Sequence, residues 1–274
     1  MRVDEQTVSI GGHDIAFGES QGAGRNVIFV HGNSSSARTW QPLLAGPFGR
    51  RHRCLAFDLP GHGRSAPARE HAAYSLPGYA AVLTGFAEAL DAPGAVVVGW
   101  SLGGHIAIEA APAMPAVQGI VIFGTPPVAS ADQMAQAFLP NPAMNVGFTA
   151  AVAPADAHAY AFSFTAPGSA LPLDDFVADI LATDGAARSS LLASIGEGKF
   201  ADEVAIAGAL RQPLAILQGA GEQLVSIDYL RQLKIPSLWR GEIQLIPGAG
   251  HAPHQETPEQ FAALLDQFIS DIGE

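Results

Sequence analysis

The stretch that decides the fold is Val96-Val-Val-Gly-Trp-Ser-Leu-Gly-Gly-His105. An apolar run typical of a strand leads into Gly99-Trp-Ser-Leu-Gly103, and a helical pattern follows directly. A serine on so sharp a turn needs a strained backbone and neighbours without bulk, which the two glycines provide. The turn lifts the Ser101 hydroxyl to a helix N-terminus, where developing negative charge is stabilised. We therefore expect Ser101 to be a nucleophile rather than part of a packing turn.

Similar apolar runs recur on both sides of this stretch, separated by helical patterns. Uninterrupted apolar strands are typical of a parallel sheet that is covered on both faces. A helix start signal, Thr257-Pro-Glu259, precedes the last helical pattern. The alternation predicts a doubly wound α/β fold with an antiparallel start. The expected strands are residues 6–10, 15–19, 26–30, 54–57, 95–98, 120–123, 214–217 and 243–246.

The alternation breaks between about residues 125 and 211, where alanine and phenylalanine are frequent and no buried strand is evident. We expect a helical lid here, inserted into a single domain of residues 1–274 whose core is residues 1–124 and 212–274. Aromatic side chains such as Phe138, Phe148 and Tyr160 have an ordinary explanation, because lid helices need apolar faces to dock. The sequence leaves open which of them also line a pocket.

A serine hydroxyl is a poor nucleophile at neutral pH and needs a base. Among nine histidines, His251 lies in Gly248-Ala-Gly-His-Ala-Pro253, after the last expected strand and before the last helix. A loop at this place reaches back over the carboxyl edge of the sheet, so we expect His251 to be the base. The alternatives are His254 and His105, and each is more ordinarily a structural histidine.

The acid that orients the base is expected in the loop after strand 214–217. That loop reads Gly219-Ala-Gly-Glu222, and Glu222 is its only carboxylate. The next acid, Asp228, is expected inside the following helix. We therefore expect Glu222 to orient His251, and the alternative is a solvated loop glutamate.

The oxyanion formed during acyl transfer needs hydrogen-bond donors that are fixed in advance. One expected donor is the backbone N–H of Leu102, the residue after the nucleophile. The second is the backbone N–H of Asn33 in His31-Gly-Asn-Ser-Ser-Ser36, with help from its side-chain amide. The competing interpretation of Asn33 is a cap of the next helix.

Composition restricts the partners and the compartment. The chain is 48% hydrophobic, enough for one sizeable core, and its net charge of −12 disfavours nucleic acid and anionic membranes. The start, from Met1 to Thr7, lacks the pattern of a secretory signal. The single cysteine, Cys54, cannot form an internal disulfide and is expected to be a buried filler. We expect a cytoplasmic location, and no pattern indicates the oligomeric state.

With these residues in place, the chain resembles the α/β-hydrolase superfamily over nearly its whole length. The order of serine, acid and histidine is that of the superfamily. Asp58-Leu-Pro-Gly-His-Gly-Arg-Ser65 is also common there, with a structural rather than catalytic acid. The resemblance implies a mostly parallel eight-stranded sheet with helices on both faces, a helical lid, and an enzyme acting on carboxylic esters without a cofactor.

The chain is also similar to the α/β-hydrolase N-acylhomoserine lactonases, which act in quorum quenching. That similarity implies a glutamate acid, and Glu222 follows Gly221, which occupies the usual aspartate position. It further implies a role for Asn33 near the oxyanion and for Tyr160 near the substrate. We also expect Trp100, beside the nucleophile, to contact substrate. The similar segments are residues 31–36, 99–106, 124–128, 183–185, 238–239 and 249–253.

The leading hypothesis is a serine hydrolase that opens the ring of N-acyl homoserine lactones by a Ser-His-Glu triad. The expected substrate is a small acyl ester or lactone. A metal-dependent lactonase would need a His-x-His cluster, and none occurs, so no metal is expected. Alternatives are a general carboxylesterase, a perhydrolase or a carbon–carbon bond hydrolase. Serine at position 101 disfavours dehalogenase and epoxide hydrolase chemistry, which needs aspartate. The alternative from another class is a ligand receptor on a hydrolase scaffold.

Overall fold

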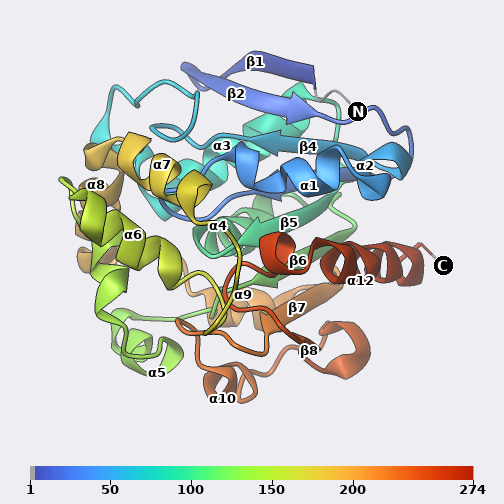
Figure 1. Ribbon diagram of the computed structural model, residues 1–274. Helices are drawn as coiled ribbons and strands as arrows, with labels where there is room; N and C mark the ends of the chain where they lie inside the picture. The colour runs from blue at the N-terminus through green and yellow to red at the C-terminus, as the bar shows by residue number, and fades with distance from the viewer. Residues whose placement is uncertain (1–3, 274) are drawn as a thin grey trace.

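A computed structural model describes residues 4–273, so residues 1–3 and 274 of the expected domain lie outside it. Its centre is an eight-stranded sheet in the order β1-β2-β4-β3-β5-β6-β7-β8 (Figure 1). β1 pairs with β2 and β2 with β4 antiparallel, and the remaining pairs are parallel. The predicted mostly parallel sheet with an antiparallel start is thereby confirmed. The strands are β1 Asp4–Ile10, β2 His13–Glu19, β3 Asn26–Val30, β4 Arg53–Phe57, β5 Val96–Trp100, β6 Gly119–Phe123, β7 Leu214–Gly219 and β8 Gln244–Ile246.

Helices cover both faces of the sheet, which is why β5, β6 and β7 are buried along their whole length. One face carries α1, α2 and α12, and the other carries α3, α4 and α9 (Figure 1). The last helix begins at Pro258, as its start signal predicts. The bounds are α1 Gln41–Leu44, α2 Pro47–Arg51, α3 Leu76–Ala89, α4 Leu102–Ala110, α9 Glu203–Ala209, α10 Ile227–Leu230, α11 Pro253–Glu256 and α12 Pro258–Asp271.

The segment between β6 and β7 is helical. Three of its helices, α6, α7 and α8, lie together beyond the carboxyl ends of the parallel strands (Figure 1). α9 differs from them because it packs against α4, in the helix layer on the sheet. The segment holds α5 Met134–Ala137, the 3₁₀ helix η5 Pro142–Phe148, α6 Pro154–Phe162, α7 Asp174–Ala182 and α8 Gly185–Gly196.

One expectation from composition is met. Cys54 is buried and unpaired, as its apolar surroundings predict. Within residues 4–273, no helix combines the length and the apolar character needed to cross a membrane.

Candidate active site

Ser101 occupies a strained turn between β5 and α4. Its φ of 52° and ψ of −116° lie in a region that residues other than glycine rarely adopt. A Cβ added to Gly99 would lie 2.3 Å from the carbonyl oxygen of Gly103, and one added to Gly103 would lie 2.1 Å from that of Val30. The expectation that both glycines are needed for room is confirmed.

A cavity of about 280 Å³ lies above this turn. Five of the expected site residues line it: Ser101, Leu102, Asn33, Tyr160 and His251. The rest of its lining is mainly apolar and comes largely from the segment between β6 and β7, with Val128, Phe138, Met144, Phe148, Leu191 and Phe200 among the side chains. An apolar cavity with a few converging polar groups is typical of a small-molecule site.

Glu222 lies behind His251 and contacts it directly. The Nδ1 atom of His251 is 2.9 Å from Oε2 of Glu222, and the two side chains are only 2% and 4% exposed. The other oxygen, Oε1, accepts a hydrogen bond of 2.7 Å from the backbone N–H of Leu224. The alternative of a solvated loop glutamate is therefore wrong. Because a carboxylate only accepts, Nδ1 donates, and Nε2 is the nitrogen left for other partners.

Ser101 and His251 meet at the same cavity. In the described part of the chain, no hydrogen bond joins the serine hydroxyl to the imidazole. Such bonds are often long before substrate binds and tighten in the reacting complex. The imidazole lies over Gly124, where an added Cβ would come within 2.6 Å of Cε1. Glycine at this position therefore leaves room for the ring.

The two other candidate bases have structural partners. His254 is fully buried, lies 2.6 Å from the hydroxyl of Thr39 and packs against the rings of Trp40 and Trp100. Burial lowers its pKa well below the ordinary value. His105 is held by Glu203 at 2.8 Å, although it also lines the cavity.

The side-chain amide of Asn33 has a different partner from the one that we expected. The side-chain Nδ2 of Asn33 donates to the carbonyl oxygen of Gly147 at 2.6 Å, so it joins this loop to η5 instead of pointing at an oxyanion. The capping alternative is wrong, because the N-cap of the next helix is Ser36. The backbone N–H groups of Asn33 and Leu102 have no acceptor within residues 4–273. Leu102 is the first residue of α4, where helical N–H groups lack partners.

The side chain of His31 fixes the conformation of this loop, a role that the sequence did not indicate. Its Nε2 accepts from the backbone N–H of Leu59 at 3.0 Å, so its Nδ1 carries the proton and donates to the carbonyl of Gly32 at 2.7 Å. Burial lowers the pKa of His31 to about 4, which keeps the ring neutral. Asp58 accepts from the backbone N–H groups of Ala37 and Arg64, a structural role like that expected from the resemblance.

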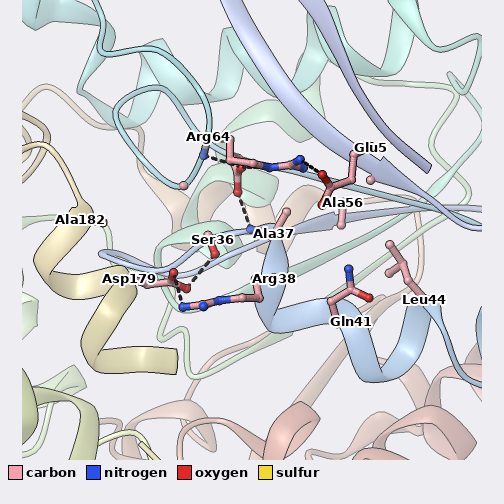
Figure 2. A pocket seen from close by; sticks show the side chains of 13 residues that line it. Glu5, Ser36, Ala37, Arg38, Gln41, Leu44, Ala56, Arg64, Asp179 and Ala182 are labelled. Carbon is pink, nitrogen blue, oxygen red and sulfur yellow. Dashed lines mark hydrogen bonds and ion pairs between the residues drawn. The ribbon is translucent and has the colours of Figure 1, made fainter. Parts of the chain in front are cut away.

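A second cavity, of about 440 Å³, is lined by Ser36, Ala37 and Arg38 where this loop ends (Figure 2). There Asp179 of α7 accepts hydrogen bonds of 2.7 Å from Ser36 and from Arg38. Arg64 pairs with Glu5 in the same cavity. Asp179 and Glu5 are thus each paired with an arginine, and the hydrogen bonds of Asp179 join α7 to the loop. Burial raises the pKa of Asp179 to about 6.

Tyr160 and Trp100 are placed very differently. Tyr160 lines the cavity, and its hydroxyl lies near Gly147, where an added Cβ would come within 2.6 Å of it. Burial raises the pKa of Tyr160. Trp100 is 1% exposed and is not part of the cavity lining. Its indole N–H donates to the backbone carbonyl of His251 at 2.8 Å, so it supports that loop. Our expectation that Trp100 contacts substrate is corrected accordingly, because the indole fills space beneath the imidazole.

Metal-ligating groups do not gather in the described chain. Across residues 4–273, no cluster of three or more His, Cys, Asp or Glu side chains is placed to hold a metal ion.

Residues 27–264 match the model of the alpha/beta hydrolase family. The chain belongs to this family. Among solved structures, this α/β hydrolase is similar to the N-acyl homoserine lactonase AidH. A variant of AidH complexed with N-hexanoyl homoserine has a TM-score of 0.93 and 35% identity, covering 99% of this chain and 98% of that one. AidH complexed with N-butanoyl homoserine has a TM-score of 0.92 and 36% identity, covering 99% and 97%.

Curated relatives of this α/β hydrolase include esterases. The pimeloyl-[acyl-carrier protein] methyl ester esterase of Nitrosomonas europaea is 26% identical over 268 residues, which cover 90% of this chain and 97% of that protein. An esterase of Mycobacterium tuberculosis is 41% identical over 103 residues, 37% of this chain and 33% of that protein. The chain spans less than half the length of several curated relatives that it matches.

Proposed function

We propose that this α/β hydrolase opens the lactone ring of N-acyl homoserine lactones, with Ser101, His251 and Glu222 as its catalytic triad. The observation that carries the proposal is the pairing of His251 with Glu222 beside the cavity that Ser101 lines, in a chain 35% identical to a lactonase over 99% of its length. A glutamate acid and an apolar cavity both suit this reaction.

In the proposed reaction, the hydroxyl oxygen of Ser101 attacks the lactone carbonyl carbon while Nε2 of His251 takes the hydroxyl proton. The backbone N–H groups of Asn33 and Leu102 donate to the oxyanion of the tetrahedral intermediate. The bond to the ring oxygen then breaks, and His251 returns the proton to that oxygen. A water molecule, deprotonated by His251, attacks the acyl-enzyme and releases Ser101. The product has gained one water, and its amide is intact.

The acyl chain would lie in the apolar part of the cavity, and the Tyr160 hydroxyl would hydrogen-bond the polar part of the substrate. We propose that residues 125–211 act as a lid within one domain, since they supply much of the cavity lining. We also propose a cytoplasmic location and no nucleic-acid partner, which the free buried Cys54 and the net charge of −12 support.

A second candidate function is hydrolysis of simple carboxylic esters. The match to the methyl ester esterase of Nitrosomonas europaea over 97% of its length favours it. The same triad would serve both reactions, so the candidates differ in what the cavity accepts. A receptor on this scaffold would bind the same compounds without turnover, and its Ser101 would not react with a fluorophosphonate.

The test compares N-hexanoyl homoserine lactone with p-nitrophenyl hexanoate, with the lactone product identified by mass spectrometry. We expect the wild type to favour the lactone and Ser101→Ala to lower kcat by at least about 10³-fold. Ser270→Ala, at an exposed position of α12, is the matched control and keeps the wild-type rate. EDTA should leave the rate unchanged. Loss of activity in EDTA, or survival of half the rate in Ser101→Ala, contradicts the proposal.

A further inference from the structure

A second imidazole–carboxylate pair lies at the same cavity, one helical turn from Ser101. The backbone N–H of His105 donates to the carbonyl of Ser101 at 3.3 Å, as expected for the next turn of α4. The Nδ1 atom of His105 lies 2.9 and 2.8 Å from the two oxygens of Glu203. Oε2 of Glu203 also accepts from the backbone N–H of Val128 at 3.0 Å. Glu203 is completely buried, and its two donors satisfy a carboxylate that would otherwise be costly to bury.

This pairing fixes what His105 presents to the cavity. A carboxylate only accepts, so Nδ1 donates to Glu203 and the ring cannot turn without losing that bond. The remaining nitrogen, Nε2, has no hydrogen-bond partner within residues 4–273. It is not fully buried, because it is not among the side-chain polar atoms that are buried without a partner. Since His105 lines the cavity, Nε2 is accessible there.

The surroundings of His105 are apolar. Its ring lies 6.4 Å from that of Phe138, and Val128 and Phe200 line the same cavity. A purely alkyl chain bound here would cover Nε2 without giving it a hydrogen bond. Leaving a polar site group unpaired is what lets an enzyme reject a substrate that lacks the matching group.

We propose that His105 is a specificity-determining residue that selects acyl chains carrying a hydroxyl group, with Glu203 as its positioning residue. A hydroxyl both donates and accepts, so it pairs with Nε2 whether or not that nitrogen is protonated. One helical turn is about 5.4 Å, so the selected hydroxyl must lie several bonds beyond the scissile carbonyl. A hydroxyl on the third carbon of the acyl chain is six bonds from the lactone carbonyl, as is a hydroxyl on the sixth carbon of a simple ester from its own carbonyl. For lactone substrates this inference rests on the proposed function. For ester substrates it does not.

The experiment uses two series of substrates. One consists of N-octanoyl homoserine lactones with and without a hydroxyl on the third carbon of the acyl chain. The other consists of p-nitrophenyl octanoates with no hydroxyl or with one on the third or sixth carbon. The quantity measured is the ratio of kcat/KM for the hydroxylated substrate to that for the plain one. The ester series is independent of lactone opening.

Three variants isolate His105. Glu203→Gln retains an oxygen for Val128 and for the imidazole, and it is the reference with which the two double variants are compared. His105→Phe together with Glu203→Gln removes Nε2 without leaving a buried charge, and the ratio should fall about tenfold, as expected for one hydrogen bond. His105→Gln in the Glu203→Gln background restores a polar group and should recover part of the ratio. Thermal melting establishes that each variant is folded.

The outcomes separate the two proposals. If lactones are not hydrolysed but the ester ratio falls in the His105→Phe background, the proposed lactonase function fails and the role of His105 stands. If lactones are hydrolysed and the ratio is the same in the wild type and in the folded His105→Phe background, the role of His105 is overturned.

Discussion

The carboxylate of Glu222 is held from two sides, by Nδ1 of His251 at 2.9 Å on Oε2 and by the backbone N–H of Leu224 at 2.7 Å on Oε1. The backbone donor therefore determines how an amide would orient if it replaced the carboxylate. This asymmetry makes the proposed role of Glu222 testable with a substitution that preserves its shape.

Replacing Glu222 by glutamine should lower kcat by about 10³–10⁴-fold. The backbone N–H of Leu224 would attract the new carbonyl oxygen, so the new NH₂ group would face Nδ1 of His251. That arrangement places the imidazole proton on Nε2, where the ring can no longer accept a proton from Ser101. Steady-state kinetics would measure the loss, with the exposed Glu242→Gln as the matched control. A Glu222→Gln enzyme within tenfold of the wild-type kcat would contradict the assignment.

Replacing Tyr160 by phenylalanine should lower kcat/KM for the lactone by about two- to tenfold, because one hydrogen bond to the substrate is lost and the ring remains. Tyr79→Phe is the matched control, since the Tyr79 hydroxyl is buried without a partner in the described chain. Kinetics on both variants would be compared with their thermal melting. Equal kcat/KM in the two variants would show that the Tyr160 hydroxyl does not contact substrate.

Gly103→Ala should destabilise the protein by about 1–3 kcal/mol, because its Cβ would lie 2.1 Å from the backbone oxygen of Val30 and the turn must shift. Gly196→Ala is the matched control, at the end of α8, where an added Cβ meets nothing within 4 Å. Its stability should be unchanged or slightly raised. Urea unfolding at pH 7 would measure both differences, and equal midpoints would contradict the close approach of β3 to the turn.

Asp179→Asn should change how stability depends on pH. The pKa of Asp179 is raised from 3.8 to about 6 in the folded protein, so the folded state binds this proton more tightly than the unfolded state does. Its contribution to stability therefore falls as pH rises from about 4 to 6. The asparagine variant lacks this loss, so its stability relative to the wild type should rise over that range by up to about 3 kcal/mol.

The matched control for Asp179 is Asp175→Asn, because Asp175 pairs with the same Arg38 but its side chain is 80% exposed. Its ion pair with Arg38 is exposed and screened by water, so this substitution should cost little stability. Denaturant unfolding between pH 4 and 7 would measure both variants. If the relative stability of Asp179→Asn instead fell with rising pH, the hydrogen bonds from Ser36 and Arg38 would outweigh the cost of burial.

The sheet and the turn at Ser101 could be predicted because their signals are local. Apolar runs bounded by glycine or proline indicate buried strands, and the glycines at 99 and 103 indicate a turn that leaves no room for side chains. That Glu222 and His251 lie close together could be predicted from the topology, because the loops after parallel strands meet at the same end of the sheet. The distance between the two side chains could not be predicted.

The remaining features join residues that are far apart in sequence. Asp179 and Ser36 are 143 residues apart, and His105 and Glu203 are 98 apart, so no local pattern indicates either contact. The orientation of Trp100 could not be predicted for a different reason. Its position beside Ser101 indicates proximity to the reaction, but proximity along the chain does not determine which way the indole points.

The hydrogen bond from the indole of Trp100 to the backbone of His251 links the strand under the proposed nucleophile to the loop that carries the proposed base. Both partners belong to the sheet framework, and neither lies between β6 and β7. The segment between β6 and β7 also reaches this loop, because the backbone N–H of Ala252 donates to the carbonyl of Phe164 and the Phe164 ring stacks on the imidazole of His251. Descendants of this sequence can therefore remodel the helices of that segment for new substrates only where they keep the contact of Phe164 with the loop of the proposed base.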